Sequence, residues 1–136
     1  MILSNKKKAA SIELELQEVE TDRANGASVK VHIKRKHLNA IFFNLWIEKY
    51  DLAKFIKNLK KVVAGKANTA ELNSPTEDDL YLILLRKDQS LFAGIRVTAY
   101  NFTPTKLKDS AALSFEIEPE SLPLFIKELE YILAKL

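Results

Sequence analysis

The sequence contains no cysteine, which excludes disulfide bridges and thiolate metal sites within this chain. It has only three glycines among 136 residues, so a glycine-rich loop that binds phosphate groups is not expected. No apolar run approaches the about 20 residues of a membrane-spanning helix, and no apolar stretch follows the lysines near the N-terminus as it would in a signal peptide. We therefore expect a cytoplasmic protein that does not contact a membrane.

Sequence motifs that carry catalysis are also absent. There is no nucleophile elbow, no Walker loop and no histidine pair in the spacing of a zinc protease. His32 and His37 are an odd number of residues apart, and such a spacing in a strand places two side chains on opposite faces. Glu13 and Glu15 alternate with apolar residues, which is typical of the solvent face of a strand. The sequence predicts a protein that is not an enzyme and holds no cofactor or metal ion.

The overall composition is ordinary for one globular domain. Apolar residues make up 47% and charged residues 29%, enough to build a buried core in a chain of this length. There are 21 basic and 18 acidic residues, and the net charge of +3 is too small to indicate a nucleic-acid partner by itself. We expect a single domain over residues 1–136, with an N-terminal half at 11–65, a C-terminal half at 66–136 and a flexible lead at 1–10.

The N-terminal half has the pattern of three strands. Apolar and polar residues alternate from Ser11 to Gln17 and again from Val29 to Lys34, as they do in strands with one solvent face. Asn25-Gly26 between them predicts a turn with positive φ. The stretch 39–47 carries bulky residues on both faces, which predicts a central strand or one covered on both sides.

Two stretches of similar sequence each predict a strand end followed by an amphipathic helix. Ile47–Leu59 returns as Ile117–Leu129, 70 residues later, with seven of the thirteen positions identical. Five of the seven are apolar, and those within the helices recur at helical spacing, so each helix should press one stripe onto the strands before it. Asp51 and Ser121 are the expected N-caps, and Gly65 is the expected left-handed C-cap of the first helix.

The C-terminal half repeats the order of strands and helix. After a link that contains a short predicted strand at Thr69–Leu72, the apolar run Leu80–Leu85 predicts a buried strand. Alternation at 91–100 and at 113–117 predicts two more, the last of them at an edge. The order predicts an α+β fold of antiparallel β-sheet with two helices, built from two β-β-β-α pseudo-repeats. One continuous sheet and two facing sheets both fit this pattern.

Single-stranded nucleic acid is an alternative partner, because PUR-type and Whirly-type binding proteins have the same layout of strands followed by a helix. Such proteins stack bases on aromatic side chains of a basic, exposed sheet face. Phe92, Arg96 and Tyr100 share one predicted strand face and come closest to this arrangement. The turn motif of PUR proteins is matched only in part by Asp88–Phe92, and the Whirly Lys-Gly-Lys motif is absent. We expect instead that Phe92 and Tyr100 form a second core face beneath a helix.

Several short motifs follow one another along the chain. They are an alternating Ile-Glu-Leu strand, a valine strand, a tryptophan strand that leads into the first helix, an acidic-flanked strand, an Arg-Val strand and a phenylalanine strand that leads into the last helix. In this sequence they are Ile12–Leu16, Val29–Ile33, Leu45–Leu59, Asp79–Leu82, Ile95–Val97 and Leu113–Leu129. This succession resembles the WapI-like immunity proteins of bacterial contact-dependent toxin systems, from about residue 11 to the end of the chain.

The resemblance implies a small cytosolic protein that binds and blocks a toxin domain and has no catalytic activity. It supplies no site residues. Contacts with a protein partner are expected in charged segments outside the repeat, at Lys34, Arg35, Lys36, His37, Lys106 and Lys108. The slight positive charge differs from that of inhibitors that mimic the acidic substrate of a nuclease. A cleft between the two halves that binds a small molecule is a third hypothesis.

Overall fold

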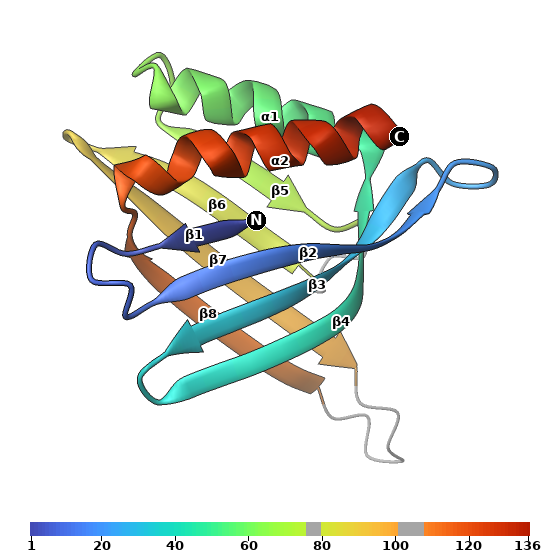
Figure 1. The fold of residues 1–136 in the computed structure, drawn as a ribbon, viewed down its shortest axis with the longest axis horizontal. Coiled ribbons are helices and arrows are strands. Elements are labelled where there is room, and N and C mark those ends of the chain that lie inside the picture. Colours follow the sequence, from blue (N-terminus) through green and yellow to red (C-terminus); the bar gives the residue numbers. More distant parts are fainter. Residues whose placement is uncertain (76–79, 101–107) are drawn as a thin grey trace.

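The protein contains two antiparallel four-stranded sheets and two helices in the computed structural model, which describes residues 1–75, 80–100 and 108–136 (Figure 1). Sheet A has the strand order β1-β2-β3-β4, and sheet B has the order β5-β6-β7-β8. The elements of the first half are β1 (Ile2–Ser4), β2 (Ser11–Glu20), β3 (Gly26–Arg35), β4 (Leu38–Glu48) and α1 (Lys49–Val63). Those of the second half are β5 (Thr69–Asn73), β6 (Leu80–Lys87), β7 (Ser90–Tyr100), β8 (Lys108–Glu116), the 3-10 helix η1 (Pro119–Ser121) and α2 (Leu122–Lys135). The predicted α+β class is confirmed, and the strands form two sheets rather than one.

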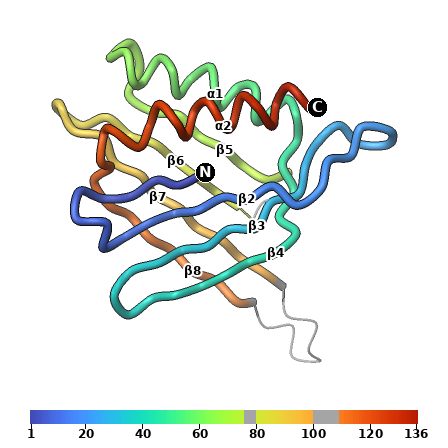
Figure 2. The backbone as a smooth tube through the Cα atoms, in the orientation of Figure 1, coloured from blue at the N-terminus to red at the C-terminus, as the bar shows by residue number. Residues whose placement is uncertain are grey.

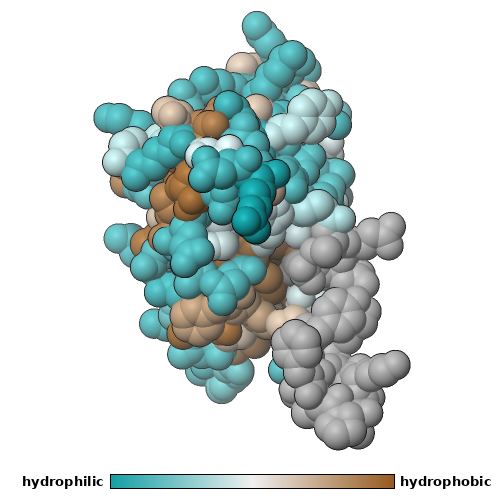
Figure 3. Space-filling view, turned by 90° about the vertical axis from the view of Figure 1, so that its right-hand side faces the viewer, coloured by the Kyte–Doolittle hydropathy of each residue, from teal (hydrophilic) through white to brown (hydrophobic). Residues whose placement is uncertain are grey.

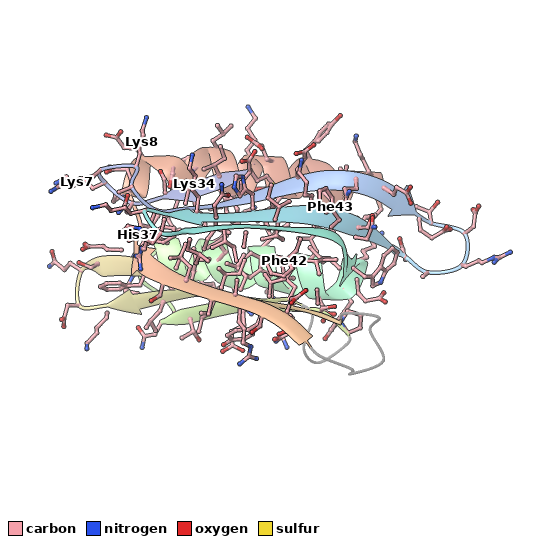
Figure 4. The ribbon with its side chains drawn as sticks, turned by 90° about the horizontal axis from the view of Figure 1, so that it is seen from below. Lys7, Lys8, Lys34, His37, Phe42 and Phe43 are labelled. Atoms are coloured by element: carbon pink, nitrogen blue, oxygen red, sulfur yellow. The ribbon has the colours of Figure 1, made fainter. Side chains whose placement is uncertain are left out.

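The two sheets face each other, and both helices lie across the side formed by β1 and β5 (Figures 1 and 2). Alternation along each strand sends every second side chain inward, where the side chains fill the space between the layers (Figure 4). The largest fully buried side chains come from both sheets and both helices: Phe55, Phe125, Leu3, Ile12, Leu14, Ile33, Leu52, Leu59, Leu72, Leu82, Leu84 and Leu129. The two halves therefore share one core.

The ends of α1 agree only in part with the sequence. The helix begins earlier than expected, directly after β4, and Asp51 lies within its first turn, so the prediction of Asp51 as N-cap is wrong. Gly65 has a φ of +76°, which confirms the left-handed C-cap. The guanidinium of Arg86 on β6 donates from Nε to the carbonyl of Val62 at 2.9 Å and from Nη2 to that of Val63 at 3.0 Å. These bonds fix the C-terminal end of α1 to sheet B.

The helix α2 starts where the sequence predicted, because Ser121 is its N-cap residue and Pro123 lies in its first turn. A proline there costs no hydrogen bond, since the first amides of a helix have no partner within it. The hydroxyl of Ser121 donates to the carbonyl of Glu118 at 2.8 Å instead of accepting from the helix. The serine therefore stabilises the 3-10 turn that precedes the helix.

The N-terminal lead contains a strand that the sequence did not reveal. Ile2–Ser4 pair antiparallel with Ser11–Glu13, and the side chain of Leu3 is fully buried. The prediction of a flexible lead is therefore wrong for these first residues. The strand was missed because three residues are too few to display an alternating pattern. In the described part of the chain, each half has four strands before its helix rather than the three expected.

β4 is an edge strand, whereas the bulk on both of its faces predicted a central or covered one. Its register with β3 shifts between Val29 and Val31, where β4 has one extra residue, and Asn44 in this segment has a φ of +58°. Such a bulge changes which face of the strand points inward, because the residue added to one strand shifts the alternation of the side chains.

The bulge explains why the apolar residues of β4 divide between two environments. Leu45 beyond the bulge is buried, and Phe42 before it is half-buried and paired with Val31 of the core. Ile41 and Phe43 stay 50% and 59% exposed. Figure 4 shows Phe42 between the two sheets and Phe43 on the other side of β4. Ile41, Phe43 and Leu45 therefore do not share the single face that alternation predicted.

Gly26 does not form the turn that Asn25-Gly26 predicted. It is the first residue of β3, and Gly65 is the glycine that has a positive φ within the described part of the chain. A Cβ atom on Gly26 would lie 2.5 Å from the carbonyl oxygen of Ile47 and 2.5 Å from the indole of Trp46. This position requires glycine because β3 and β4 approach closely, and not because the backbone is left-handed.

The substitution Phe125→Ala should lower the free energy of unfolding by about 3–5 kcal/mol, because this phenyl ring is fully buried in the shared core. Its neighbour Leu124 is 61% exposed, so Leu124→Ala should change the same quantity by no more than about 0.5 kcal/mol. Urea unfolding followed by circular dichroism measures both variants. Equal losses of stability would contradict the burial of Phe125 and the exposure of Leu124 on α2.

Candidate partner-binding surface

Two loops at one end of sheet A carry a cluster of basic side chains. The β1–β2 loop contributes Lys6–Lys8, and the β3–β4 hairpin contributes Lys34–His37. Every side chain in these two segments is exposed, and the labelled members of both lie at the same end of the molecule (Figure 4). We call these two segments together the basic end.

The register of sheet A brings these two loops together. Ser4 pairs with Ser11, Ser11 pairs with Lys34, and Lys34 pairs with Asn39, so these residues form one row across all four strands. The two hairpin loops follow directly from this row, and neighbouring strands lie about 5 Å apart. The basic end is therefore a consequence of strand pairing, and it unites segments that are about 27 residues apart in the sequence.

Charge is distributed unevenly along sheet A. Six of the 21 basic residues lie in the basic end, and the remaining 15 are outnumbered by the 18 acidic residues of the chain. Glu18, Glu20 and Asp22 lie in and next to the β2–β3 hairpin, which is at the opposite end of the sheet (Figure 1). A chain with a net charge of only +3 therefore presents a strongly basic surface at one end.

A groove of about 930 Å³ runs between the basic end and the start of α2. Its charged lining consists of Lys8, Lys34, Arg35, Lys36, Glu118, Glu120 and Glu128. Its lining also includes Ile2 and Leu124, whose side chains are 50% and 61% exposed. Exposed apolar side chains surrounded by charged ones are the usual composition of a protein–protein contact.

The basic residues of the hairpin differ in their partners. Arg35 donates from Nη2 to the carbonyl of Ser114 on β8 at 2.7 Å, so it connects sheet A to sheet B. In the part of the chain that the structure describes, no ion pair involves Lys34 or Lys36. These two lysines are therefore available to a partner, whereas Arg35 is already used within the fold.

The other two predicted contact residues do not join this cluster. Lys106 lies outside the described residues. Lys108 is the first residue of β8, and the structure describes its backbone but not its side chain. Its backbone is six residues, or about 20 Å, along the strand from Ser114, which Arg35 contacts. The structure therefore separates Lys108 from the basic hairpin.

The predicted nucleic-acid face forms the outer surface of sheet B. Phe92 is half-buried and Arg96 is exposed on the same face of β7, while the side chain of Tyr100 lies outside the description. The helices pack at the edges of the sheets and do not cover this face (Figure 1). The expectation that Phe92 belongs to a core face beneath a helix is therefore wrong. Glu116 pairs with Phe92, so the basic character of this face is weak.

Tyr81 and Arg96 lie in contact on this outer face. The guanidinium carbon of Arg96 lies 5.5 Å from the centre of the Tyr81 ring, which is a cation–π geometry. Burial raises the pKa of Tyr81 above its ordinary value of 10.0, the neighbouring Glu71 carboxylate raises it further, and Arg96 opposes this rise. The phenolate is therefore less favourable in the folded protein than in the unfolded chain.

Titratable groups do not converge into a metal site in the described part of the chain, where no three His, Cys, Asp or Glu side chains could hold one ion. The Nε2 atom of His32 lies 2.5 Å from the Asn39 Oδ1 atom on the outer face of sheet A.

Among the helices of the described ranges, none has the length and apolar character to cross a membrane.

Some residues of this surface were missed by the sequence analysis. Lys6–Lys8 were assigned to a flexible lead, and the alternation pattern placed Ile41 and Phe43 on a covered face. A sequence signal for the pairing of Ser4 with Ser11 would have placed these lysines next to the β3–β4 hairpin. The strand that makes this pairing is only three residues long and gives no such signal. The exposure of Ile41 and Phe43 depends on the bulge, which has no sequence signature beyond Asn44.

The model of the immunity protein WapI-like family matches residues 1–136. No curated protein and no solved structure matches the chain.

The substitution Glu71→Gln should lower the pKa of Tyr81, because it removes the carboxylate that disfavours the phenolate. Arg96→Gln should raise that pKa further. Nuclear magnetic resonance of the labelled tyrosine ring measures both as a function of pH. Since the pKa is higher in the folded than in the unfolded chain, its contribution to stability is present below pH about 10 and is lost as the pH rises through the folded value. An unchanged pKa in Glu71→Gln would contradict this assignment.

Proposed function

Because this chain belongs to the immunity protein WapI-like family, we propose that it neutralises a bacterial toxin domain by binding it directly. The match over the whole chain is the observation that carries this proposal. The protein acts in the cytoplasm, has no catalytic activity of its own and blocks the toxin by covering its functional surface.

The basic end and its groove are the proposed contact with the toxin. Lys34 and Lys36 extend from a hairpin, and the groove beside them exposes Ile2 and Leu124. Apolar contact area favours a stable complex, and surrounding charges raise the rate at which the partners meet in the correct orientation. A basic surface fits an acidic partner, so the proposed toxin presents carboxylates around an apolar patch.

Single-stranded nucleic acid is the second candidate, and one observation favours it. The outer face of sheet B is uncovered and carries Arg96 over Tyr81 and, four residues away along β7, the half-buried Phe92. Binding of bases there requires basic groups that follow the phosphate backbone. The lysines of the basic end project from loops of the other sheet, and Glu71 and Glu116 lie on the aromatic face itself. This separation makes the protein partner the better hypothesis.

The double substitution Lys34→Glu/Lys36→Glu should weaken binding to the cognate toxin domain by about 10-fold to 100-fold, because charge reversal at an interface replaces attraction with repulsion. The cognate toxin is the product of the toxin reading frame next to that of this protein. Isothermal titration at low and high salt measures the affinity, and co-expression with the toxin measures rescue of growth. Both the affinity and the rescue should fall in the variant.

The matched control is Lys57→Glu/Lys66→Glu, which makes the same change of net charge at exposed positions near α1. It should leave toxin binding within about two-fold of the unsubstituted protein, since exposed charges far from an interface are screened by salt. Failure of the unsubstituted protein to rescue growth would refute the proposed function. Salt-dependent binding of a labelled single-stranded oligonucleotide that is lost in Arg96→Gln would favour the second candidate.

A further inference from the structure

The two sheets have four outer edges, and two of them are covered by helices. β1 has only three residues and has α2 beside it, and β5 has α1 beside it (Figure 1). Covering and shortening are two ways in which proteins prevent an exposed edge from pairing with another chain. The edges β1 and β5 are therefore protected.

The edge strand β8 is protected by its composition. Asp109 and Glu116 place charges at both of its ends. The residues between them are mainly small, and the exposed ones among them are Ser110, Ala112 and Ser114. Charged side chains on an edge strand oppose its pairing with another chain.

β4 lacks these protections. It has 11 residues, and the ten from Leu38 to Ile47 include no charged residue and no proline. Within the described ranges, β3 is the strand that pairs with it, and its other side is the edge of sheet A. Ile41 and Phe43 are 50% and 59% exposed on the outer face beside this edge. From the right-hand side of Figure 1, apolar surface is visible at the height of β4 and also higher up, toward the helices (Figure 3).

We propose that Leu38–Phe43 of β4 accepts an extended segment of the toxin domain as a fifth strand of sheet A. This inference rests on the proposed function and names the partner's chemistry. The unpaired backbone groups of β4 bind the segment through main-chain hydrogen bonds, and alternate side chains of the segment pack against Ile41 and Phe43. The bulge at Asn44 ends regular pairing, so the segment is about six residues, or about 20 Å, long.

Charge specifies one end of this segment. Lys36 and His37 immediately precede β4, and both are exposed. The part of a bound segment that lies opposite Leu38 is therefore next to the basic end. Acidic residues at that end of the segment would meet the basic hairpin. The occupant is thus an extended segment with alternating apolar residues and with acidic residues at one end.

A second copy of this protein fits the edge less well. In an antiparallel pair of two β4 strands, the basic hairpin of each copy lies near 43–45 of the other. That stretch contains no acidic residue, and the bulge at Asn44 interrupts it. Self-pairing therefore provides apolar contact but no partner for the basic hairpin.

A random octapeptide display library, selected on the full-length protein, tests the inference without the toxin. Enriched peptides should carry acidic residues toward one end and alternate apolar residues along the rest. Phe43→Lys should weaken binding of the enriched peptides at least 10-fold. Val19→Lys, a control at a 38%-exposed position on β2 of the same sheet, should change it by no more than two-fold. N-methylation of alternate amides in the best peptide should abolish binding, because main-chain hydrogen bonds carry it.

The outcomes separate this inference from the proposed function. It is overturned if no peptide is enriched, if Phe43→Lys binds the peptides unchanged, or if the protein instead self-associates through β4 on a sizing column. It is also overturned if the unsubstituted protein and Phe43→Lys rescue cells from the toxin equally well. If neither rescues but peptide selection behaves as described, the immunity function and the toxin as occupant fail, and the binding of an extended segment at β4 stands. Equal urea midpoints of Phe43→Lys and the unsubstituted protein show that the variant folds.

Discussion

The apolar core that the two sheets share is the constraint on which the rest of the structure depends. Each sheet has one apolar face, and neither could bury it alone. The helices close the core along β1 and β5, where Phe55 and Phe125 are fully buried. Because both helices are used on that side, β4 and β8 remain as open edges. The position of the helices therefore decides which parts of the molecule are available to a partner.

The sequence was sufficient to predict what depends on local pattern. The stripes of α1 and α2 and the left-handed Gly65 follow from spacing within about 15 residues, because each helix presents a face of constant period. The strand order is different. It depends on pairing between distant segments, and local alternation carries no information about which strand lies at an edge. For this reason β4 was predicted to be covered although it is an edge strand.

The candidate surface was predictable only in part for the same reason. The Lys34–His37 segment is visible in the sequence as a cluster of charge, and the structure leaves it exposed. The position of Lys6–Lys8 beside it depends on the pairing of Ser4 with Ser11. This pairing could not be predicted, because the strand that contains Ser4 has only three residues and shows no alternating pattern. The exposed apolar strip at Ile41 and Phe43 depends on the bulge in β4. The bulge, with Asn44 in the left-handed conformation, thus turns Ile41 and Phe43 to the outer face of sheet A.

The two proposed contact surfaces meet at the start of β4, and they make different contributions to binding. Charges at the basic end act over about 8–10 Å in physiological salt and orient an approaching partner. Main-chain pairing and the apolar strip act only at contact and slow dissociation. An unprotected edge also favours aggregation, which proteins usually avoid with charges or bulges. In β4 the bulge at Asn44 limits regular pairing to Leu38–Phe43, so the edge is long enough to bind a short strand and too short to support extended self-association.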